Sequence, residues 1–248
     1  MTTTITRGLE TTGLAKSFGG VHAVDNATVA FHHGKVNALI GPNGSGKTTF
    51  FNCVTGMIKP DAGSVSYRGE DITGRPPHRI ARAGIGRSFQ LCRVFPRMTV
   101  LENLLASVRS PTLPGWLRSA RQRGDIERAR ELLMRVGIDH LEHAEARDLS
   151  YGQQKLLELA GVLMTDPETI MLDEPAGGVN PALLDRIANL VRALNAEGKT
   201  FLIVEHNMDL VMSLSDHVVV FDRGAPIAEG SPDEVRADPR VLEAYLGS

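Results

Sequence analysis

Long apolar runs are missing from this 248-residue sequence. A membrane-spanning helix needs about 20 consecutive apolar residues, and no stretch approaches that length, so we expect no segment that crosses a membrane. The opening residues 1–7 lack the apolar core that a signal peptide has. Any role at a membrane would therefore be peripheral, through another protein.

Cysteine and net charge are also scarce. The two cysteines, Cys53 and Cys92, do not have the separation of a metal site, so free buried thiols are the simplest interpretation. A formal net charge of −2 gives no general attraction to nucleic acid. The 42% hydrophobic and 23% charged residues are ordinary for a globular protein. The length suits one large α/β domain, or a core with a smaller subdomain.

Residues 41–49 carry the most informative pattern, Gly-Pro-Asn-Gly-Ser-Gly-Lys-Thr-Thr. It fits a phosphate-binding loop, and it lies between the apolar run 36–40, read as a buried strand, and residues 50–54, which can open a helix. The glycines let backbone N–H groups converge on an anion, and the helix start adds partial positive charge. Lys47 supplies a full charge for the β- and γ-phosphates, and the Thr48 hydroxyl can ligate Mg²⁺. These features argue against a glycine-rich turn without a ligand.

A second pattern of nucleotide sites lies about 130 residues downstream, where the apolar run 169–172 ends in Asp173 and Glu174. An acid at the tip of a buried strand can hold Mg²⁺, usually through water. Glu174 can face the γ-phosphate and polarise the attacking water. Acidic pairs after strands are common, so this interpretation depends on the phosphate loop.

Apolar runs alternate with amphipathic segments along most of the chain. This alternation predicts an α/β fold, a phosphate-loop core with a mostly parallel sheet covered on both faces. Residues 8–35 predict a small N-terminal antiparallel β subdomain. We predict a single domain, with 1–90 and 161–248 forming the core and 91–160 an inserted helical subdomain that carries the third motif described below.

Several local expectations follow from sequence patterns. Residues 98–108 predict a helix capped by Thr99, with Glu102 three residues on. The basic stretch 116–123 is interpreted as a solvated loop in preference to a segment near anionic head groups. One helix is predicted to end the chain, from Asp233 to about Tyr245.

Phe18 precedes a Gly-Gly turn, and the local sequence leaves two alternatives open. Its ring is either part of the core or exposed near the phosphate loop. An exposed aromatic ring there could stack on a nucleotide base.

The stretch Leu149-Ser-Tyr-Gly-Gln153 reveals a family resemblance. The phosphate loop, Gln90 at a strand end, this LSxGQ stretch, the Asp173-Glu174 pair and the strand-end His206 follow the order found in the ATP-binding cassette (ABC) ATPases. The resemblance covers nearly the whole chain, and other phosphate-loop proteins lack the LSxGQ element. It implies that the phosphate-loop core is RecA-like.

The resemblance implies roles around bound ATP and Mg²⁺. Phe18 resembles the aromatic residue that stacks on adenine, which favours the exposed alternative. The residues that resemble the phosphate cradle are Asn43, Gly44, Ser45, Gly46, Lys47, Thr48 and Thr49. Gln90 resembles the glutamine that approaches Mg²⁺ and the attacking water. Asp173 looks like the magnesium acid and Glu174 like the general base, while His206 resembles the switch histidine at the γ-phosphate.

Ser150, Gly152 and Gln153 resemble the signature that meets the γ-phosphate of a partner subunit. In the family, each ATP lies between the phosphate loop of one subunit and the signature of the other. Two ATP molecules thus close a head-to-tail dimer, and hydrolysis reopens it. The chain alone should be a poor ATPase.

Several stretches are similar to one subgroup, the ATPases of branched-chain amino acid importers. They are residues 87–90, 98–103, 151–154, 173–181, 205–206 and 244–247. Tyr151 in place of the commoner glycine and Asn180 in place of aspartate fit this subgroup and remove no catalytic group. The subgroup typically pairs two different ATPase chains, and this one resembles the longer type, with extra residues near 108–124.

The subgroup resemblance also implies partners and a location. The partners are a second, different ATPase chain, integral membrane permease subunits and, indirectly, a periplasmic solute-binding protein, with no nucleic acid. The location is the cytoplasmic face of a bacterial inner membrane. Residues 91–105 would form the groove that receives a short helix of the membrane subunit.

Other functions stay open at this point. They are an importer of urea or short amides, a lipopolysaccharide exporter, and a soluble ABC ATPase acting on ribosomes or DNA. Soluble members usually carry two cassettes or long coiled-coil insertions, and this sequence has neither.

Overall fold

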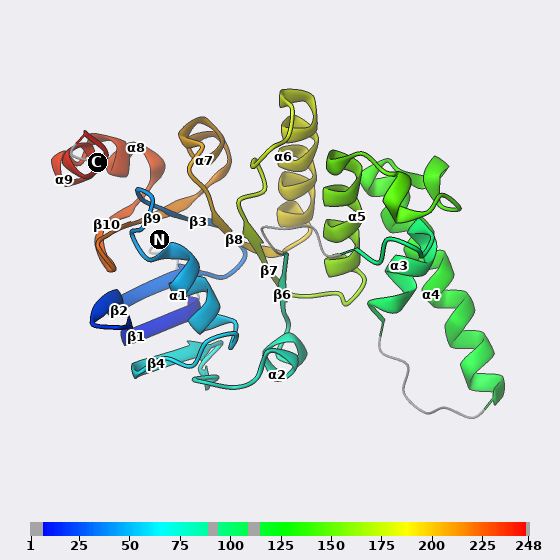
Figure 1. The fold of residues 1–248 in the computed structure, drawn as a ribbon, viewed down its shortest axis with the longest axis horizontal. Coiled ribbons are helices and arrows are strands. Elements are labelled where there is room, and N and C mark those ends of the chain that lie inside the picture. Colours follow the sequence, from blue (N-terminus) through cyan, green and yellow to red (C-terminus); the bar gives the residue numbers. More distant parts are fainter. Residues whose placement is uncertain (1–6, 89–93, 109–114, 247–248) are drawn as a thin grey trace, which may run out of the picture. The chain divides into compact units, whose positions relative to one another are not determined.

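The computed structural model describes residues 7–88, 94–108 and 115–246 of the chain (Figure 1). The chain divides into two compact units. The first comprises Met1–Arg87, Glu168–Glu174 and Arg192–Ser248, and the second comprises Ser88–Pro167 and Pro175–Val191. Among the helices of the described residues, none is both long and apolar enough to cross a membrane.

A six-stranded sheet forms the centre of the first unit. Its strand order is β10-β9-β3-β8-β7-β6, in which all neighbours are parallel except the edge strand β10. Every residue of β3, β7 and β8 is buried, as expected for parallel strands covered on both faces. The predicted α/β fold with a mostly parallel sheet is therefore confirmed. The strands are β3 (Val36–Ile40), β6 (Ile85–Arg87), β7 (Thr169–Asp173), β8 (Thr200–Val204), β9 (His217–Asp222) and β10 (Ala225–Gly230).

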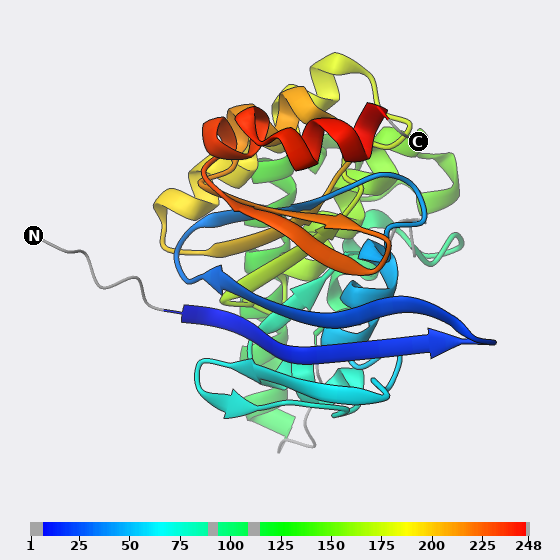
Figure 2. The same ribbon diagram turned by 90° about the vertical axis from the view of Figure 1, so that its left-hand side faces the viewer.

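A separate antiparallel sheet has the order β2-β1-β4-β5. Its strands are β1 (Arg7–Phe18), β2 (Val21–His32), β4 (Ala62–Tyr67) and β5 (Glu70–Asp71). The long hairpin β1–β2 is the pair of blue strands in Figure 2. This sheet confirms the predicted antiparallel element and extends it, because the hairpin strands run several residues beyond the apolar stretches that predicted them.

Helix α1 (Lys47–Val54) packs between the two sheets. Phe50 is fully buried, with its ring edge-on to Phe31 of the hairpin at 6.1 Å and to Phe221 of the parallel sheet at 5.2 Å. Such aromatic contacts add roughly 0.5–1.5 kcal/mol each beyond the buried area. The phosphate loop is thus followed by a helix held on two sides.

The other face of the parallel sheet carries the C-terminal helices. Helices α7 (Met208–Leu214), α8 (Pro232–Ala237) and α9 (Pro239–Leu246) cover it, and the red helices α8 and α9 lie over β9 and β10 (Figure 2). The prediction of one terminal helix was wrong. Pro239 has no N–H and disfavours helical dihedrals in Asp238, whose ψ of 119° separates α8 from α9.

The second unit is helical. Thr99 caps α3 through a capping box with Glu102, as predicted. The basic stretch 116–123 lies within α4 and is not a loop, because its arginines and alanine favour helix and Gly124 alone does not end one. The helices are α3 (Val100–Ala106), α4 (Gly115–Val136), α5 (Tyr151–Leu163), the 3₁₀ turns Asp139–Leu141 and Ala146–Asp148, and the first part of α6 (Pro181–Ala196). Helix α2 (Pro77–Arg82) belongs to the first unit.

Candidate functional site

Residues 41–46 connect the buried strand β3 to α1 at the carboxyl end of the parallel sheet. Two of the glycines are required by close backbone approach. Gly41 has φ of 149° and Gly46 has φ of 98°, and a Cβ on either would collide with a main-chain carbonyl oxygen, of Phe221 and Ala23 respectively. The curled loop predicted from the glycine pattern therefore depends on contacts from two other segments.

The first turn of α1 carries no side-chain cap, because its N-cap is Gly46. Helix starts leave backbone N–H groups without intrahelical partners and carry partial positive charge. Asn43, Gly44, Thr48 and Thr49 surround this turn, and the Thr48 side chain is exposed. The arrangement suits an anion such as a phosphate group.

Lys47 is buried, and its ammonium donates to the loop itself. Nζ lies 2.7 Å from the Gly41 carbonyl oxygen, 2.8 Å from that of Pro42 and 3.4 Å from the Ser45 hydroxyl. Burial lowers the pKa of Lys47, while the carboxylates of Glu174 and Asp173 oppose that shift. The charges of both carboxylates therefore act on the Lys47 ammonium, although Asp173 and Glu174 lie more than a hundred residues away in the sequence.

Asp173 ends β7 and is almost fully buried, and Glu174 follows it. Burial raises the pKa of Asp173, and a hydrogen bond from Arg87 opposes the rise. Glu174 has a positive φ of 48°, which is uncommon for glutamate, and its N–H donates to the Val204 carbonyl at 2.9 Å. Strained backbone of this kind is found at functional sites, where the surroundings hold it.

Arg87 is a functional candidate that the sequence reasoning did not single out. It ends β6, next to β7 in the sheet, and its guanidinium forms an ion pair with Asp173 at 2.9 Å. The same group donates to side chains of Asn52 and Thr55 at 2.8 and 2.7 Å. The sequence signal for Arg87 was its place in residues 87–90, one of the stretches similar to the importer ATPases.

His206 lies just beyond β8 and its side chain is 58% exposed. The preceding Glu205 is fully buried and was also missed by the sequence reasoning. Its carboxylate accepts from the backbone N–H groups of His206 and Asn207 at 2.9 and 3.1 Å, which fixes the turn that presents the imidazole. Asn207 then caps α7.

The Phe18 ring is exposed, which decides between the two alternatives left by the local sequence. Phe18 ends β1 at the Gly19-Gly20 turn, and 48% of the residue is accessible. The Lys16 ammonium lies 5.4 Å from its ring centroid. One face of the hairpin tip therefore offers an aromatic surface.

The predicted signature lies at the start of α5 in the second unit. Ser150 is the N-cap, and it exchanges hydrogen bonds with Gln153 in a capping box. Gln153 thus has a structural role here, while the N–H groups of Tyr151 and Gly152 belong to the same first turn. A Cβ at Gly152 would lie 2.5 Å from a terminal carbon of the Leu183 side chain, so glycine leaves room for that side chain of α6.

The two departures from the common ABC pattern have local explanations. The Tyr151 ring lies against Gly178, so it points toward the loop that follows β7. Asn180 accepts the Leu183 N–H at 2.9 Å and so caps α6, a role that asparagine performs as well as aspartate.

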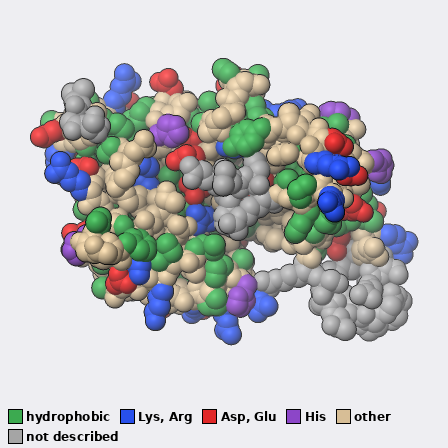
Figure 3. All heavy atoms as spheres, viewed as in Figure 1, with side chains coloured by type: hydrophobic (Ala, Val, Ile, Leu, Met, Phe, Trp, Pro, Cys, Tyr) green, Lys and Arg blue, Asp and Glu red, His purple; other side chains and the backbone are tan. Residues whose placement is uncertain are grey.

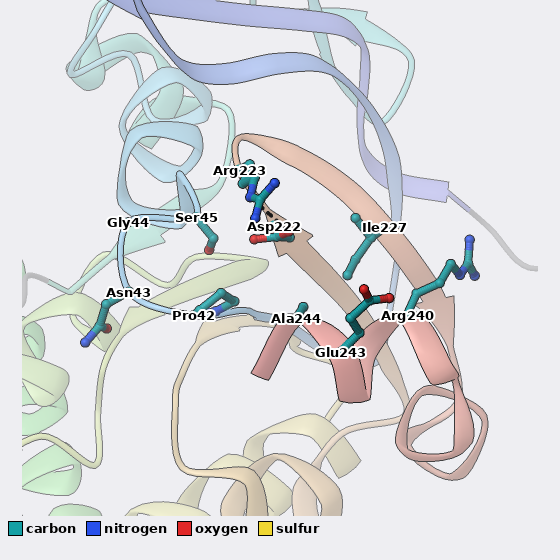
Figure 4. Close-up of a pocket in the computed structure, with 10 residues that line it drawn as sticks. All are labelled: Pro42, Asn43, Gly44, Ser45, Asp222, Arg223, Ile227, Arg240, Glu243 and Ala244. Carbon is teal, nitrogen blue, oxygen red and sulfur yellow. Dashed lines mark ion pairs between the residues drawn. The ribbon is translucent and has the colours of Figure 1, made fainter. Parts of the chain in front are cut away.

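An open cavity of about 570 Å³ lies beside the phosphate loop in the first unit (Figure 4). The loop residues 42–45 form one side, the β9–β10 turn another and α9 a third. Tyr245 of α9 packs on the apolar cluster that includes Ile40. Burial raises the pKa of Tyr245. Helix α9 thus lies beside the phosphate loop, on the opposite side of this cavity.

The first unit therefore brings Lys47, Asp173 and Glu174 together, with Thr48 at the same helix start. His206 follows β8, the neighbour of both β3 and β7. Ser150, Gly152 and Gln153 belong to the other unit. Gln90 lies outside the described residues. Hydroxyl and carboxylate oxygens such as those of Thr48 and Asp173 are ligands that Mg²⁺ prefers, so the residues present fit this ion.

A phosphate loop between a buried parallel strand and a helix, with an acid pair on a nearby strand tip, defines a phosphate-loop nucleoside triphosphatase. The chain belongs to the ABC transporter family, since that family model matches residues 24–177. It is an ABC-type ATPase, as the sequence predicted. A second model, described as branched-chain amino acid ATP-binding cassette transporter, matches residues 225–248.

Curated relatives match along nearly the full length. The high-affinity branched-chain amino acid transport ATP-binding protein BraF of Pseudomonas aeruginosa is 43% identical over 250 residues, covering 96% of this chain and 97% of the relative. The corresponding LivG protein of Escherichia coli is 42% identical with the same coverage.

Solved structures agree with this assignment. A nucleotide-free ATP-binding cassette from an ABC transporter has a TM-score of 0.86 at 38% identity, covering 98% of this chain and 100% of that one. An ABC transporter cassette in its ADP conformation has the same score and identity, covering 98% and 99%.

Proposed function

We propose that this chain is the ATP-binding and ATP-hydrolysing subunit of an importer for branched-chain amino acids. The observation that carries the proposal is the 43% identity to BraF across nearly the whole chain. The match of the C-terminal model to residues 225–248 supports it, because that segment lies outside the general ABC match, which ends at residue 177. The proposed location is the cytoplasmic face of a bacterial inner membrane.

ATP binds with its phosphates on the loop 43–49 and its adenine against the Phe18 ring. Lys47 exchanges its bonds to the loop carbonyls for bonds to the β- and γ-phosphates, which retains its charge-assisted hydrogen bonds. Thr48 and Asp173, with Gln90, hold Mg²⁺, which neutralises charge on the phosphates when bound. The contacts of Lys47 and the burial of Asp173 support these assignments.

Glu174 acts as the general base. It takes a proton from water as the water oxygen bonds to the γ-phosphorus, while the bond from that phosphorus to the bridging oxygen breaks and leaves ADP. His206, held by Glu205, contacts the γ-phosphate. The strained backbone of Glu174 supports a fixed position for its carboxylate.

Two such ATPase chains complete each other's sites. Ser150 and Gly152 of one chain meet the γ-phosphate on the loop of the partner, which is a different ATPase chain. The open first turn of α5, beyond the capping box, provides N–H groups for that contact. Isolated chains should therefore hydrolyse ATP slowly.

Closing and reopening of the ATPase dimer are transmitted to permease subunits through the surface near α3. A periplasmic binding protein delivers the solute to those permease subunits. Figure 3 shows hydrophobic side chains at the surface where Figure 1 places α3. Phe95 is 57% exposed there, and Leu101 and Leu105 are half-buried. An exposed apolar surface of this kind suits a partner helix.

Complementation of uptake tests this function. A bacterial strain that lacks its own equivalent ATPase subunit, but keeps the other importer subunits, should regain leucine uptake when it expresses this chain. The Glu174→Gln variant at the same expression level should not restore uptake. Restoration of urea uptake without leucine uptake, or recovery of the chain with ribosomes and no permease, would refute the proposal.

A further inference from the structure

Arg87 occupies a junction in the first unit. It is the last residue of β6, and its side chain is only 10% exposed. Its guanidinium contacts three side chains from two other segments of the chain: Asp173 at 2.9 Å, Asn52 at 2.8 Å and Thr55 at 2.7 Å. The guanidinium carbon also lies 5.1 Å from the centroid of the Phe51 ring.

The elements joined by Arg87 are those that carry the candidate chemistry. Asn52 lies in α1 and Thr55 follows that helix, which begins at Lys47. Asp173 is the buried acid at the tip of β7. One planar group therefore links the phosphate-loop helix to the acid that would hold the metal ion.

We propose that Arg87 is a positioning residue for Mg²⁺-ATP, which orients the Asp173 carboxylate and ties it to α1. The inference rests on the proposed role of Asp173 as a magnesium acid. One carboxylate oxygen, Oδ2, accepts from Arg87 Nη2, so the position of that oxygen is set before the ion arrives. Groups that orient a metal ligand in this way typically affect metal affinity by roughly 10–100-fold.

The geometry requires arginine specifically. Both Nη1 and Nη2 are used, one on the helix side and the other on Asp173. A lysine ammonium is a point charge without this planar fork, and it cannot reproduce the arrangement. If Arg87 only balanced charge, lysine at this position would bind Mg²⁺ equally well. If Arg87 only competed with Mg²⁺ for the Asp173 carboxylate, its removal would strengthen Mg²⁺ binding. The positioning role predicts weaker Mg²⁺ binding in both cases.

Binding of a fluorescent ATP analogue to the full-length chain provides the test. It is measured in EDTA and then at rising free Mg²⁺, which separates nucleotide binding by the phosphate loop from the magnesium contribution without requiring hydrolysis. For Arg87→Met we expect the half-maximal Mg²⁺ concentration to rise at least tenfold, with EDTA-state affinity changed less than threefold. Arg87→Lys should show a similar rise. An unchanged or lower Mg²⁺ midpoint, or full rescue by lysine, would overturn the inference.

One further variant, with a matched control, keeps the test decisive if loss of Arg87 prevents folding. Thr55→Val removes one acceptor at nearly constant volume and should shift the Mg²⁺ midpoint in the same direction by about two- to tenfold. No shift would count against Arg87. Arg68→Met, which breaks the exposed ion pair with Glu168 in the same unit, is the matched control and should leave the midpoint unchanged.

Asp173→Asn separates this inference from the function on which it rests. If that variant loses the Mg²⁺ response while the Arg87 variants keep it, only the role of Arg87 is refuted. If Asp173→Asn itself retains a normal Mg²⁺ midpoint, the metal assignment is refuted, and the positioning role with it.

Discussion

Replacement of Glu174 by glutamine tests the proposed chemistry most directly. Glutamine has nearly the same shape, and the backbone at this position is held by the hydrogen bond from its N–H to Val204. The change therefore removes a negative charge and a proton acceptor with little change in geometry. General-base catalysis contributes roughly 10²–10⁴-fold, so we expect turnover to fall by that factor.

The same substitution should spare ATP binding. Two carboxylates oppose the lowering of the Lys47 pKa by burial. Glu174 has the larger effect, and Asp173, the second, remains in the variant. Removal of the Glu174 charge therefore leaves the Asp173 carboxylate near Lys47, together with the loop carbonyls that its ammonium contacts. ATP should thus bind but not be cleaved, and the closed dimer should accumulate.

Phosphate release at saturating Mg²⁺-ATP measures turnover, and size-exclusion chromatography with ATP measures dimer formation. Both assays should include the proposed partner ATPase chain. Glu168→Gln, at an exposed glutamate of the same unit, is the matched control and should behave like the unmodified protein. Hydrolysis by Glu174→Gln at the original rate would show that another group is the base.

Three further predictions concern the first unit. Lys47→Ala should weaken ATP binding roughly tenfold or more, the equivalent of a lost charged hydrogen bond, and unchanged affinity in calorimetry would contradict the cradle role. Tyr67→Phe, which loses a buried hydrogen bond to Thr169, should lower the free energy of unfolding measured with urea and leave ATP affinity unchanged, and a changed affinity would contradict this purely structural role. Burial, and secondly the positive charge of His32, lowers the pKa of His217 to about 4. Since the unfolded histidine titrates near 6.5, the free energy of unfolding should fall as pH drops from 6.5 to 4, by less than about 1.4 kcal/mol per pH unit because the ring is partly exposed. Urea unfolding of His217→Gln should show a shallower pH dependence, and an equal slope would refute this cause.

Local patterns predicted many element boundaries because the responsible interactions are themselves local. Strand β3 has the bounds of the apolar run 36–40, and β7 extends the run 169–172 by one residue. The Thr99 capping box was predictable because its two residues lie three positions apart. The terminal helix was mispredicted because helical periodicity continued across Pro239 and outweighed the break that proline imposes. The basic segment of α4 was mispredicted because charge indicates exposure, which a solvated helix and a loop share.

The sequence by itself determined the phosphate loop, the acid pair and the ABC family, because these depend on fixed spacings of residue types. Only the tertiary structure decided what holds them. Arg87 reaches Asp173 across 86 positions of sequence, and that contact exists because β6 and β7 pair in one particular register. Likewise, the complete burial of Glu205 and the packing of Tyr245 on the apolar cluster that includes Ile40 arise from contacts between segments far apart in the chain. The spacing of residues along the chain does not predict such contacts, because they depend on how strands align and helices pack.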